Sequence, residues 1–441
     1  MTTLISMIGK GKVDEQHNNQ YEKVAYSFEN GITVTTSCST NAILKSGLYS
    51  IDKVIMIGTT TSSWGELLDD PSPDEKEVFD KLFNDCKEKY PFAVKSEIAT
   101  KLKFLLLKRW NVKDVSFVAT EAELTSKTAE YIYSEYVKKC MGTERNYILD
   151  VTHGLRWMPM FLTSAIRYKE MVEHGLNSMR LLYAENPSVD SRNSSKDSLK
   201  KGYIRELDAL WKGQKTAEAM VLFFDKFDSD ELISYLPDSC VHLKEAMENF
   251  ADSMQADYLM PLVWDHEDKT SDYPLGKTIK QLYNGIADVD NVNPCPIWLH
   301  AVASEMTIWV NRLKNLKFPS ERLLELADMY AERRLWGQAV LALDVALRIF
   351  ACEYYEPKTY PNWDMTDKYL KTLTNCLSQP KRSGFHSINK SAVENIMHTR
   401  NMIAHGTIPR SKTEKMQVKP NLSKQYPVFK NTLKSLFAYR H

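Results

Sequence analysis

The order of hydrophobic patterns along the chain constrains its fold more than any other feature of the sequence. Up to about residue 190, short β-rich runs alternate with stretches of helical periodicity. We predict five strands in this region, Leu4 to Ile8, Val54 to Ile57, Val115 to Val118, Tyr147 to Leu149 and Met179 to Tyr183. Such alternation is typical of a parallel sheet with helices on both faces. The sequence therefore predicts an α/β, Rossmann-like N-terminal domain.

An added hairpin is expected early in this domain. Residues 21–28 and 32–36 are rich in strand-forming residues and flank the turn sequence Glu29-Asn30-Gly31. A glycine-containing turn between two such runs is a hairpin signal. We therefore predict a Rossmann-like order with an inserted hairpin.

The pattern becomes helical in the second half of the chain. Residues 186–201 are polar and serine-rich, which is typical of a loop or linker. From Leu207 onward apolar residues recur at helical spacing, and residues 321–351 resemble one tetratricopeptide-like helical hairpin. Because only one such unit is visible, we interpret it as a helix pair within a larger bundle. The predicted divisions are residues 1–188, a helical connecting region 189–310, and an all-α domain 311–441.

Charge and cysteine content limit the kind of protein. Lys and Arg together number 57, as do Asp and Glu, so the net charge of zero argues against a globally basic RNA-binding surface. The seven cysteines include no C-x-x-C pair, which predicts a reducing cytoplasm and neither a zinc site nor a disulfide framework. Without a signal-peptide profile or roughly 18 consecutive apolar residues, we expect a cytoplasmic protein without a membrane anchor.

Small and hydrogen-bonding residues follow four of the predicted strands. Ligands of open α/β sheets bind beyond the carboxyl ends of the strands, where glycines let backbone N–H groups approach and hydroxyls donate or accept. The residues that we expect to contact a ligand there are Gly9, Lys10, Gly58, Thr59, Thr60, Thr61, Ser62, Asp150, Thr152, His153, Gly154 and Arg156. Neither a dinucleotide fingerprint nor a P-loop is present, so the sequence favours a nucleotide recognised by loops and gives no support for ATP hydrolysis.

Ordinary structural roles remain as alternatives at this edge. Any one of these loops could consist merely of good turn and N-cap residues, but their coincidence on one predicted edge favours a ligand site. His153 could contact a nucleotide, act on a phosphate bond, or be a turn residue bonded to Asp150. A buried ion pair between Asp150 and Arg156 is the main structural alternative to ligand contact.

A second candidate site lies near the C-terminus, at Arg400, Asn401 and His405. If these residues end a helix, with Gly406 as its stop, Asn401 and His405 are i,i+4 neighbours and the long Arg400 side chain can reach the same pocket. RNA cleavage by its own 2′-hydroxyl needs a base, an acid and a group that stabilises the extra phosphate charge. His405 titrates near neutrality, Arg400 can bind phosphate and Asn401 can orient either, so the trio is suited to metal-independent cleavage.

One chain supplies only one such histidine, so we predict a composite site across a two-fold dimer. The alternative is that Arg400 and His405 merely satisfy carbonyls and the dipole at a helix end. A basic strip follows the motif and could hold RNA phosphates, although a solvated polar loop is an equally ordinary explanation. The strip consists of Arg410, Lys412, Lys415, Lys419 and Lys424.

The two motifs, in this order, resemble the CARF-HEPN proteins of type III CRISPR systems. The sensor resemblance is carried by residues 54–59, by Asp150-Val151-Thr152-His153-Gly154-Leu155-Arg156 and by the early hairpin. The effector resemblance is carried by Arg400-Asn401 and His405-Gly406, which match the HEPN pattern R-[NH]-x-x-x-H. The first spans most of residues 1–185, the second only about residues 320–410, and residues 190–320 match no family that we can name.

The resemblance implies a fold and an activity. Residues 1–188 are expected to be a CARF domain that binds a cyclic oligoadenylate, with cyclic tetra-adenylate favoured, at a dimer interface. Residues 311–441 are expected to be a HEPN domain that cleaves single-stranded RNA and leaves a 2′,3′-cyclic phosphate. The oligoadenylate acts as an allosteric activator and no cofactor or metal is implied. Higher oligomers, and slow degradation of the activator by the sensor, are further hypotheses.

A non-enzymatic role is the competing interpretation. In it, the sheet domain senses a nucleotide and a catalytically silent helical domain binds a partner protein. Changing His405 to Ala separates the two, because only the ribonuclease hypothesis requires that cleavage be lost while ligand binding is kept.

Overall fold

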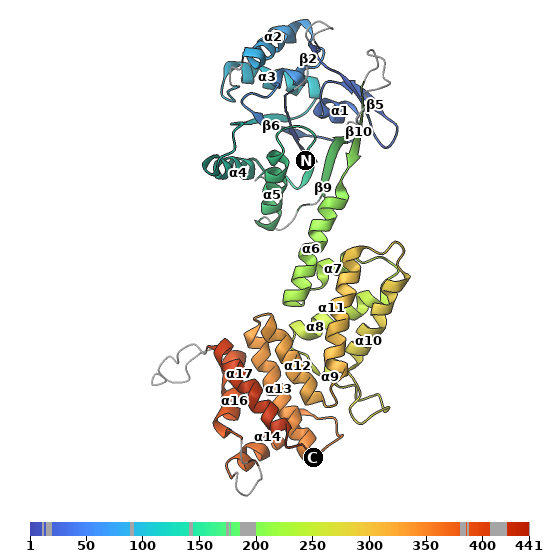
Figure 1. Cartoon of the computed structure of the whole chain (residues 1–441), viewed down its shortest axis with the longest axis vertical. Coiled ribbons are helices and arrows are strands. Elements are labelled where there is room, and N and C mark those ends of the chain that lie inside the picture. Colours follow the sequence, from blue (N-terminus) through green and yellow to red (C-terminus); the bar gives the residue numbers. More distant parts are fainter. Residues whose placement is uncertain are drawn as a thin grey trace. The chain divides into compact units, whose positions relative to one another are not determined.

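The computed structural model describes residues 1–10, 13–14, 20–88, 92–140, 144–172, 176, 178–185, 200–379, 385, 388–405 and 421–440. The side chains of residues 13, 14, 20, 85–88, 140 and 405 are outside this description. The chain groups into two compact units, Met1–Gly213 and Gln214–His441 (Figure 1). Among the described residues, no helix is long and apolar enough to cross a membrane.

A twisted eight-stranded sheet forms the centre of the N-terminal unit as far as it is described, in the order β5-β4-β10-β9-β8-β1-β6-β7. Its strands are β1 (Thr2–Met7), β4 (Val24–Ser27), β5 (Thr33–Thr36), β6 (Lys53–Thr59), β7 (Asp114–Thr120), β8 (Asn146–Asp150), β9 (Ser178–Glu185) and β10 (Lys200–Glu206). The run from β9 to β7 is parallel throughout. A separate short ribbon pairs β2 (Val13–Asp14) with β3 (Gln20–Tyr21).

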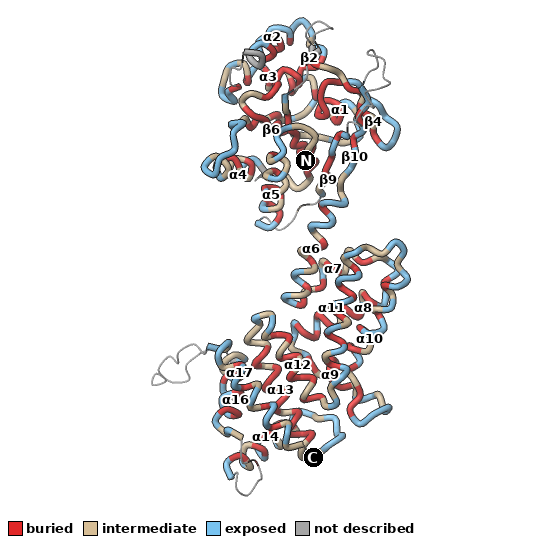
Figure 2. Tube along the Cα trace, viewed as in Figure 1, coloured by how far each residue is buried: buried red, intermediate tan, exposed pale blue. Residues whose placement is uncertain are grey.

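Helices cover both faces of the sheet because side chains of its central strands alternate between two apolar cores. In β1, Leu4 belongs to one core and Ile5 to the other. The first core is closed by helices α1 (Ser39–Lys45), α2 (Pro73–Glu88) and α3 (Glu97–Trp110) with the 3-10 helix η1 (Trp64–Leu68). The second is closed by α4 (Ser126–Cys140) and α5 (Trp157–Val172). Figure 2 shows the buried strands between these helices, whose outer faces are exposed.

The structure confirms the α/β prediction and all five predicted parallel strands, each extended by one or two residues at one or both ends, while β1 ends at Met7, one residue before the predicted Ile8. The hairpin is also confirmed, with β4 antiparallel to β5 and Gly31 at a positive φ of 87° in its turn. Sequence analysis missed β10, part of which had been assigned to the linker. In β10 Gly202 and Ile204 are buried between exposed neighbours, and this strand joins the hairpin to β9. Residues 186–199 of the predicted linker lie outside the described part of the chain.

The second unit is helical throughout its described residues, as predicted. Its helices are α7 (Asp230–Tyr235), α8 (Val241–Gln255), α9 (Met260–Val263), α10 (Lys277–Ile286), α11 (Ile297–Lys314), α12 (Pro319–Glu332), α13 (Trp336–Tyr355), α14 (Trp363–Leu377), α16 (Lys390–His405) and α17 (Leu422–Phe437), with a 3-10 turn η2 (Ala287–Asn291). Helix α6 (Asp208–Lys226) begins before the boundary between the units and ends after it.

The predicted helical hairpin is formed by α12 and α13, joined by a turn in which Arg334 has a positive φ of 59°. Helix α13 packs against α12, α14, α16 and α17 and is therefore apolar on most of its surface. One hydrophobic core extends from Ala219 to Leu436. It draws on both predicted helical regions, while the predicted boundaries at 188/189 and 310/311 stay predictions.

Candidate functional site

The loops that follow β1 and β8 meet at the carboxyl edge of the sheet. β1 lies between β8 and β6, so the chain order reverses direction there, which is where open α/β sheets bind ligands. A Cβ atom added to Gly9 would lie 3.2 Å from the Gly154 nitrogen and 3.9 Å from the His153 Cβ. Gly154 itself has a φ of 94°, which side chains disfavour. The sequence thus places glycine on both sides of this close approach.

Asp150 supports this edge from the interior of the domain. Its side chain is fully buried, and its Oδ2 accepts hydrogen bonds from the hydroxyls of Ser6 and Ser39, each at 2.6 Å. Its Oδ1 accepts from the Thr152 N–H at 3.1 Å and from the Thr152 hydroxyl, which in turn accepts from the Ala184 N–H at 2.8 Å. Four donors satisfy the buried carboxylate, so it fixes β1, the start of α1 and the loop after β8. Arg156 is exposed, and no ion pair joins it to Asp150 among the described contacts.

The loop after β6 is tied to the loop after β1. The Ser62 hydroxyl donates to the Ile8 carbonyl at 3.0 Å and accepts from the Thr59 N–H at 2.9 Å. The Ser63 N–H donates to the Gly9 carbonyl at 2.8 Å. Ser62 and Thr59 are buried, so their hydroxyls organise the loop from inside.

Gly58 allows neighbouring side chains to pack closely against the backbone. A Cβ added there would lie 2.7 Å from Ile8 Cγ2 and 2.8 Å from Trp64 Cζ2, closer than side chains tolerate. Thr60 and Thr61, which follow, are partly exposed, and the Thr60 N–H is held by the Thr120 carbonyl at 2.8 Å. Thr60 and Thr61 are therefore partly accessible residues on a fixed loop, with the Thr61 hydroxyl 3.3 Å from that of Thr59.

His153 is held in its neutral form. The Ser39 N–H, the first of helix α1, points at His153 Nε2 from 3.5 Å, a long contact that suits an unprotonated nitrogen. Burial lowers the pKa of His153 below its usual 6.5, and the nearby Asp150 charge only partly opposes this. A neutral ring with Nε2 facing Ser39 carries its proton on Nδ1, where it is a hydrogen-bond donor.

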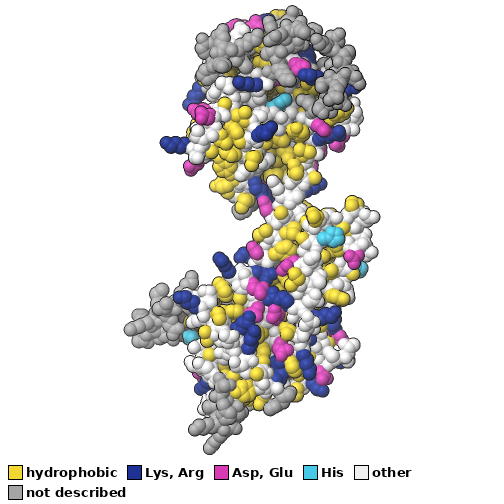
Figure 3. Space-filling model, viewed as in Figure 1, with side chains coloured by type: hydrophobic (Ala, Val, Ile, Leu, Met, Phe, Trp, Pro, Cys, Tyr) yellow, Lys and Arg dark blue, Asp and Glu magenta, His cyan; other side chains and the backbone are white. Residues whose placement is uncertain are grey.

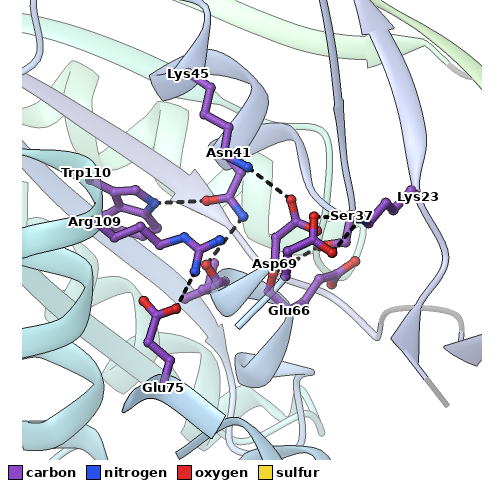
Figure 4. Close-up of polar contacts among 11 residues, drawn as sticks. Lys23, Ser37, Asn41, Lys45, Glu66, Asp69, Glu75, Arg109 and Trp110 are labelled. Atoms are coloured by element: carbon purple, nitrogen blue, oxygen red, sulfur yellow. Dashed lines mark hydrogen bonds and ion pairs between the residues drawn. The ribbon is translucent and has the colours of Figure 1, made fainter. Parts of the chain in front are cut away.

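Helix α1 is fixed on its other side by contacts that Figure 4 shows. Asn41 donates to the Leu67 carbonyl at 3.3 Å and accepts from Trp110 Nε1 at 2.9 Å, and Lys45 pairs with Asp69 at 3.1 Å. These bonds join α1 to η1 and α3. The start of α1, which supports Asp150 and faces His153, is therefore held in place from two sides.

Glu66 lies in the same neighbourhood and was not recognised from the sequence. Its side chain is buried on η1, and burial, with a smaller contribution from the Asp69 charge, raises the pKa of Glu66 to about 8. In Figure 4 its carboxyl stands apart from the drawn hydrogen bonds. Glu66 is therefore largely protonated at neutral pH.

The structure sorts the predicted ligand residues into two groups. The buried ones shape the loops: Gly58, Thr59, Ser62 and Asp150. The partly or fully exposed ones line the edge: Gly9, Lys10, Thr60, Thr61, Thr152, His153, Gly154 and Arg156. The second group offers hydroxyl donors, an imidazole N–H and two cations, a set that suits a ligand with several phosphates.

An apolar face adjoins this edge, because α5 begins at Trp157 directly after Arg156. Figure 3 shows apolar side chains gathered on the N-terminal unit in this region. The large exposed side chains of α4 and α5, which we call the α4–α5 face, are Tyr131, Met160, Tyr168, Met171 and Val172. Exposed apolar patches of this kind mark contact surfaces.

The C-terminal motif ends helix α16, as the sequence predicts. The Arg400 side chain is 25% exposed, and its Nε lies 3.7 Å from the Asp344 carboxylate on α13. Its NH1 donates to the Asn401 Oδ1 at 3.0 Å. Ile403 packs toward the start of α13, near Gly337. Packing on α13 therefore fixes the turn that carries Arg400 and Asn401.

Several predicted features of this site lie outside the described part of the chain. His405 is the last residue of α16, but its side chain is not described. Gly406 and the basic strip from Arg410 to Lys419 are not described either. Lys424 is exposed on α17. The joint action of Arg400, Asn401 and His405 stays a prediction.

Sequence analysis missed the residues that support the two motifs. Ser6, Ser39 and Thr40 form the hydroxyl network under Asp150, and Asp344 contacts Arg400. The available signals were a serine inside the apolar β1 and an aspartate inside the apolar run of α13. Each is a polar residue at a core position.

The described residues contain no group of three or more His, Cys, Asp or Glu side chains arranged to hold a metal ion. No disulfide bond joins the cysteines whose side chains are described.

Comparison with known proteins concerns mainly the N-terminal unit. Residues 3–185 match the model of the CARF domain of the CRISPR system endoribonuclease Csx1. This range contains every candidate ligand-site residue described above and ends at β9. The match confirms the predicted resemblance for the sensor region.

The solved structure of Enterococcus italicus Csm6 bound to cyclic hexa-2'-fluoro-hexa-dAMP is similar with a TM-score of 0.38 and 11% identity. That alignment covers 99% of this chain and 94% of the Csm6 chain. No curated protein sequence matches this chain.

Proposed function

We propose that the chain is a type III CRISPR accessory endoribonuclease, activated by a cyclic oligoadenylate that binds at the carboxyl edge of the N-terminal sheet. The observation that carries the proposal is the match of residues 3–185 to the CARF domain of a CRISPR endoribonuclease. The edge of this region exposes Lys10, Thr60, His153 and Arg156, a chemistry that suits successive phosphates and ribose hydroxyls.

The helical unit is the proposed HEPN ribonuclease. The RNA 2′-oxygen attacks the adjacent phosphorus, the bond from phosphorus to the 5′-oxygen breaks, and a 2′,3′-cyclic phosphate and a 5′-hydroxyl remain. His405 takes or gives the proton, Arg400 binds the phosphate oxygens, and Asn401 orients the guanidinium through its bond to NH1. These roles need no metal ion, so the proposed reaction proceeds in EDTA.

A second copy of the chain completes both sites in this proposal. One histidine cannot serve as base and acid in the same step, whereas two copies supply both. The α4–α5 face supports such a dimer, because it is apolar, exposed and continuous with the ligand edge at Arg156. Met160→Glu combined with Met171→Glu is expected to give monomers by sedimentation. A double variant that stays dimeric would move the interface elsewhere.

The test of the whole proposal is cleavage of a fluorogenic single-stranded RNA in EDTA, with cyclic tri-, tetra- and hexa-adenylate added separately. We expect cleavage with one ring, cyclic tetra-adenylate first, and none from His405→Ala, which still binds the ring. Binding of a ring without cleavage would favour the non-enzymatic regulator. Neither binding nor cleavage with any ring would overturn the proposal.

A further inference from the structure

A buried carboxylate on α13 stands behind the end of α16. The side chain of Asp344 is 2% exposed, on the mostly apolar helix α13. One of its oxygens, Oδ2, lies 2.7 Å from Arg348 Nε and 3.7 Å from Arg400 Nε. The other, Oδ1, is buried without a hydrogen-bond partner among the described residues. Burying a carboxylate is costly unless it is paired, so its presence at this position calls for an explanation.

Arg348 holds that carboxylate independently of Arg400. It lies one turn after Asp344 on the same helix, and its side chain is 11% exposed. Its guanidinium carbon lies 5.3 Å from the centre of the Trp363 ring, and its NH1 lies 3.5 Å from the Asp367 carboxylate. Arg348 therefore keeps the Asp344 carboxylate in place whether or not Arg400 is in contact with it.

The contact with Asp344 uses only one edge of the Arg400 guanidinium. Nε faces the buried carboxylate, and NH1 donates to Asn401, whose side chain is exposed. A guanidinium has five N–H donors in one plane, so the remaining donors are left for an anion. Holding the Nε edge sets the plane in which the outer donors meet that anion.

We propose that Asp344 is a positioning residue for Arg400, which it orients toward the scissile phosphate, with Arg348 as its fixed partner. This inference rests on the proposed ribonuclease function, because it takes Arg400 to be the phosphate-binding group. Its chemical reason is that a pre-oriented cation loses less conformational freedom when charge develops on the phosphate.

The experiment is a double-mutant cycle in the full-length chain. Asp344→Asn, Arg400→Ala and the double variant are compared with the unaltered chain for activator-dependent RNA cleavage at saturating RNA. We expect Asp344→Asn to lower the cleavage rate roughly 10- to 100-fold, the order of loss that follows from misplacing a reacting group. In the Arg400→Ala background, we expect the same change to have no further effect, because its target is gone.

Two more variants keep the result interpretable. Asp344→Glu keeps a carboxylate beside Arg348 but moves it by one methylene group. It is expected to lose cleavage rate as Asp344→Asn does, and it provides the test if Asp344→Asn fails to fold. Asp328→Asn is the matched control, because Asp328 on α12 is likewise a paired carboxylate, which accepts from the Tyr426 hydroxyl at 2.7 Å and pairs with Lys430 rather than with Arg400. The control is expected to cleave at the unaltered rate.

The outcomes separate the two levels of the proposal. An equal loss from Asp344→Asn with and without Arg400 means a general structural role and overturns the positioning inference, as does full activity of Asp344→Asn. In both of those cases the ribonuclease itself stands. Absence of cleavage by the unaltered chain with every ring overturns the proposed function, and the inference with it.

Discussion

The two candidate sites of this chain are built in opposite ways. The sheet edge is assembled from segments far apart in sequence, since Gly9, Thr60 and His153 come together only because β1, β6 and β8 are neighbours. The helix end gathers Arg400, Asn401 and His405 within six residues of a single helix. An edge shared by several strands can surround a ligand, whereas one helix end presents a single face.

Because of this difference, the two sites depend on different kinds of residues. At the sheet edge, buried side chains such as Asp150 and Ser62 hold the loops, and the exposed ones are left for a ligand. At the helix end, Arg400 has one buried anchor, and the proposed chemistry needs groups from a second copy. Changes at the sheet edge should therefore act through loop geometry, and changes at the helix end through individual side chains.

The sharpest test of this separation is Arg400→Ala. We expect activator-dependent cleavage to fall roughly 10²- to 10³-fold, as when a donor that stabilises developing charge is removed. The affinity for cyclic tetra-adenylate, measured by calorimetry, is expected to stay unchanged. Lys390→Ala, on the same helix and paired with Glu394, is the control and should leave both quantities unchanged. A parallel loss of ligand affinity in Arg400→Ala would contradict the independence of the two sites.

Glu66→Gln tests how strongly burial constrains the sheet domain. The pKa of Glu66 is raised to about 8 in the folded chain from 4.5, so its contribution to stability is fully present below pH 4.5 and is lost as pH rises toward 8. A glutamine at this position cannot ionise, so the variant does not lose this stability as pH rises. We expect Glu66→Gln to raise the free energy of unfolding at pH 8 by about 2–4 kcal/mol relative to the unaltered chain.

The measurement is hydrogen exchange of β6 and β8 peptides at pH 5 and pH 8, which reports opening of the N-terminal unit. Glu97→Gln, at an exposed position on α3, is the control and should leave the exchange unchanged at both pH values. Equal exchange of the Glu66 variant and the unaltered chain at pH 8 would mean that Glu66 stays solvated.

Gly58→Ala tests whether this glycine serves packing. The added methyl group would stand 2.7 Å from Ile8 Cγ2 and 2.8 Å from Trp64 Cζ2, so a destabilisation of roughly 1–3 kcal/mol is expected from overpacking. Chemical denaturation of the full chain, monitored by hydrogen exchange of the β6 and β8 peptides, measures this loss of stability. Gly213→Ala meets no atom within 4 Å and should not destabilise the chain. Unchanged stability of Gly58→Ala would show that the loop after β6 yields easily.

The smallest expected effect concerns His153. Because burial lowers its folded pKa below 6.5, the unfolded chain binds more protons in that range, and stability should decline as pH falls below about 6.5. His153→Gln should remove this part of the pH dependence while behaving like the unaltered chain at pH 8. Denaturation curves between pH 5 and pH 8 measure it, and exposed His300→Gln serves as control. An unaltered slope in His153→Gln would assign the pH dependence to other groups.

Much of the fold could be predicted because local patterns agree with it. The five parallel strands, the hairpin, the α12–α13 pair and the end of α16 at His405 each follow from periodicity and turn residues within a short segment. Strand β10 was not predicted because most of its residues are exposed and polar and a polar run precedes it. Its place is decided by pairing with β9 and β4 rather than by its own sequence.

The sequence by itself identified the candidate residues for the proposed chemistry: the run from Asp150 to Arg156, the hydroxyls after β6, and Arg400 with Asn401. Only the tertiary structure decided which of them face outward. Asp150 and Thr59 are buried, whereas Thr60 and His153 are partly exposed and Arg156 is exposed. It alone revealed Asp344 behind Arg400 and Ser39 beside His153. The physical reason is that spacing along the chain fixes neighbours within one helix or strand, whereas burial and hydrogen bonding depend on the segments that fold against it.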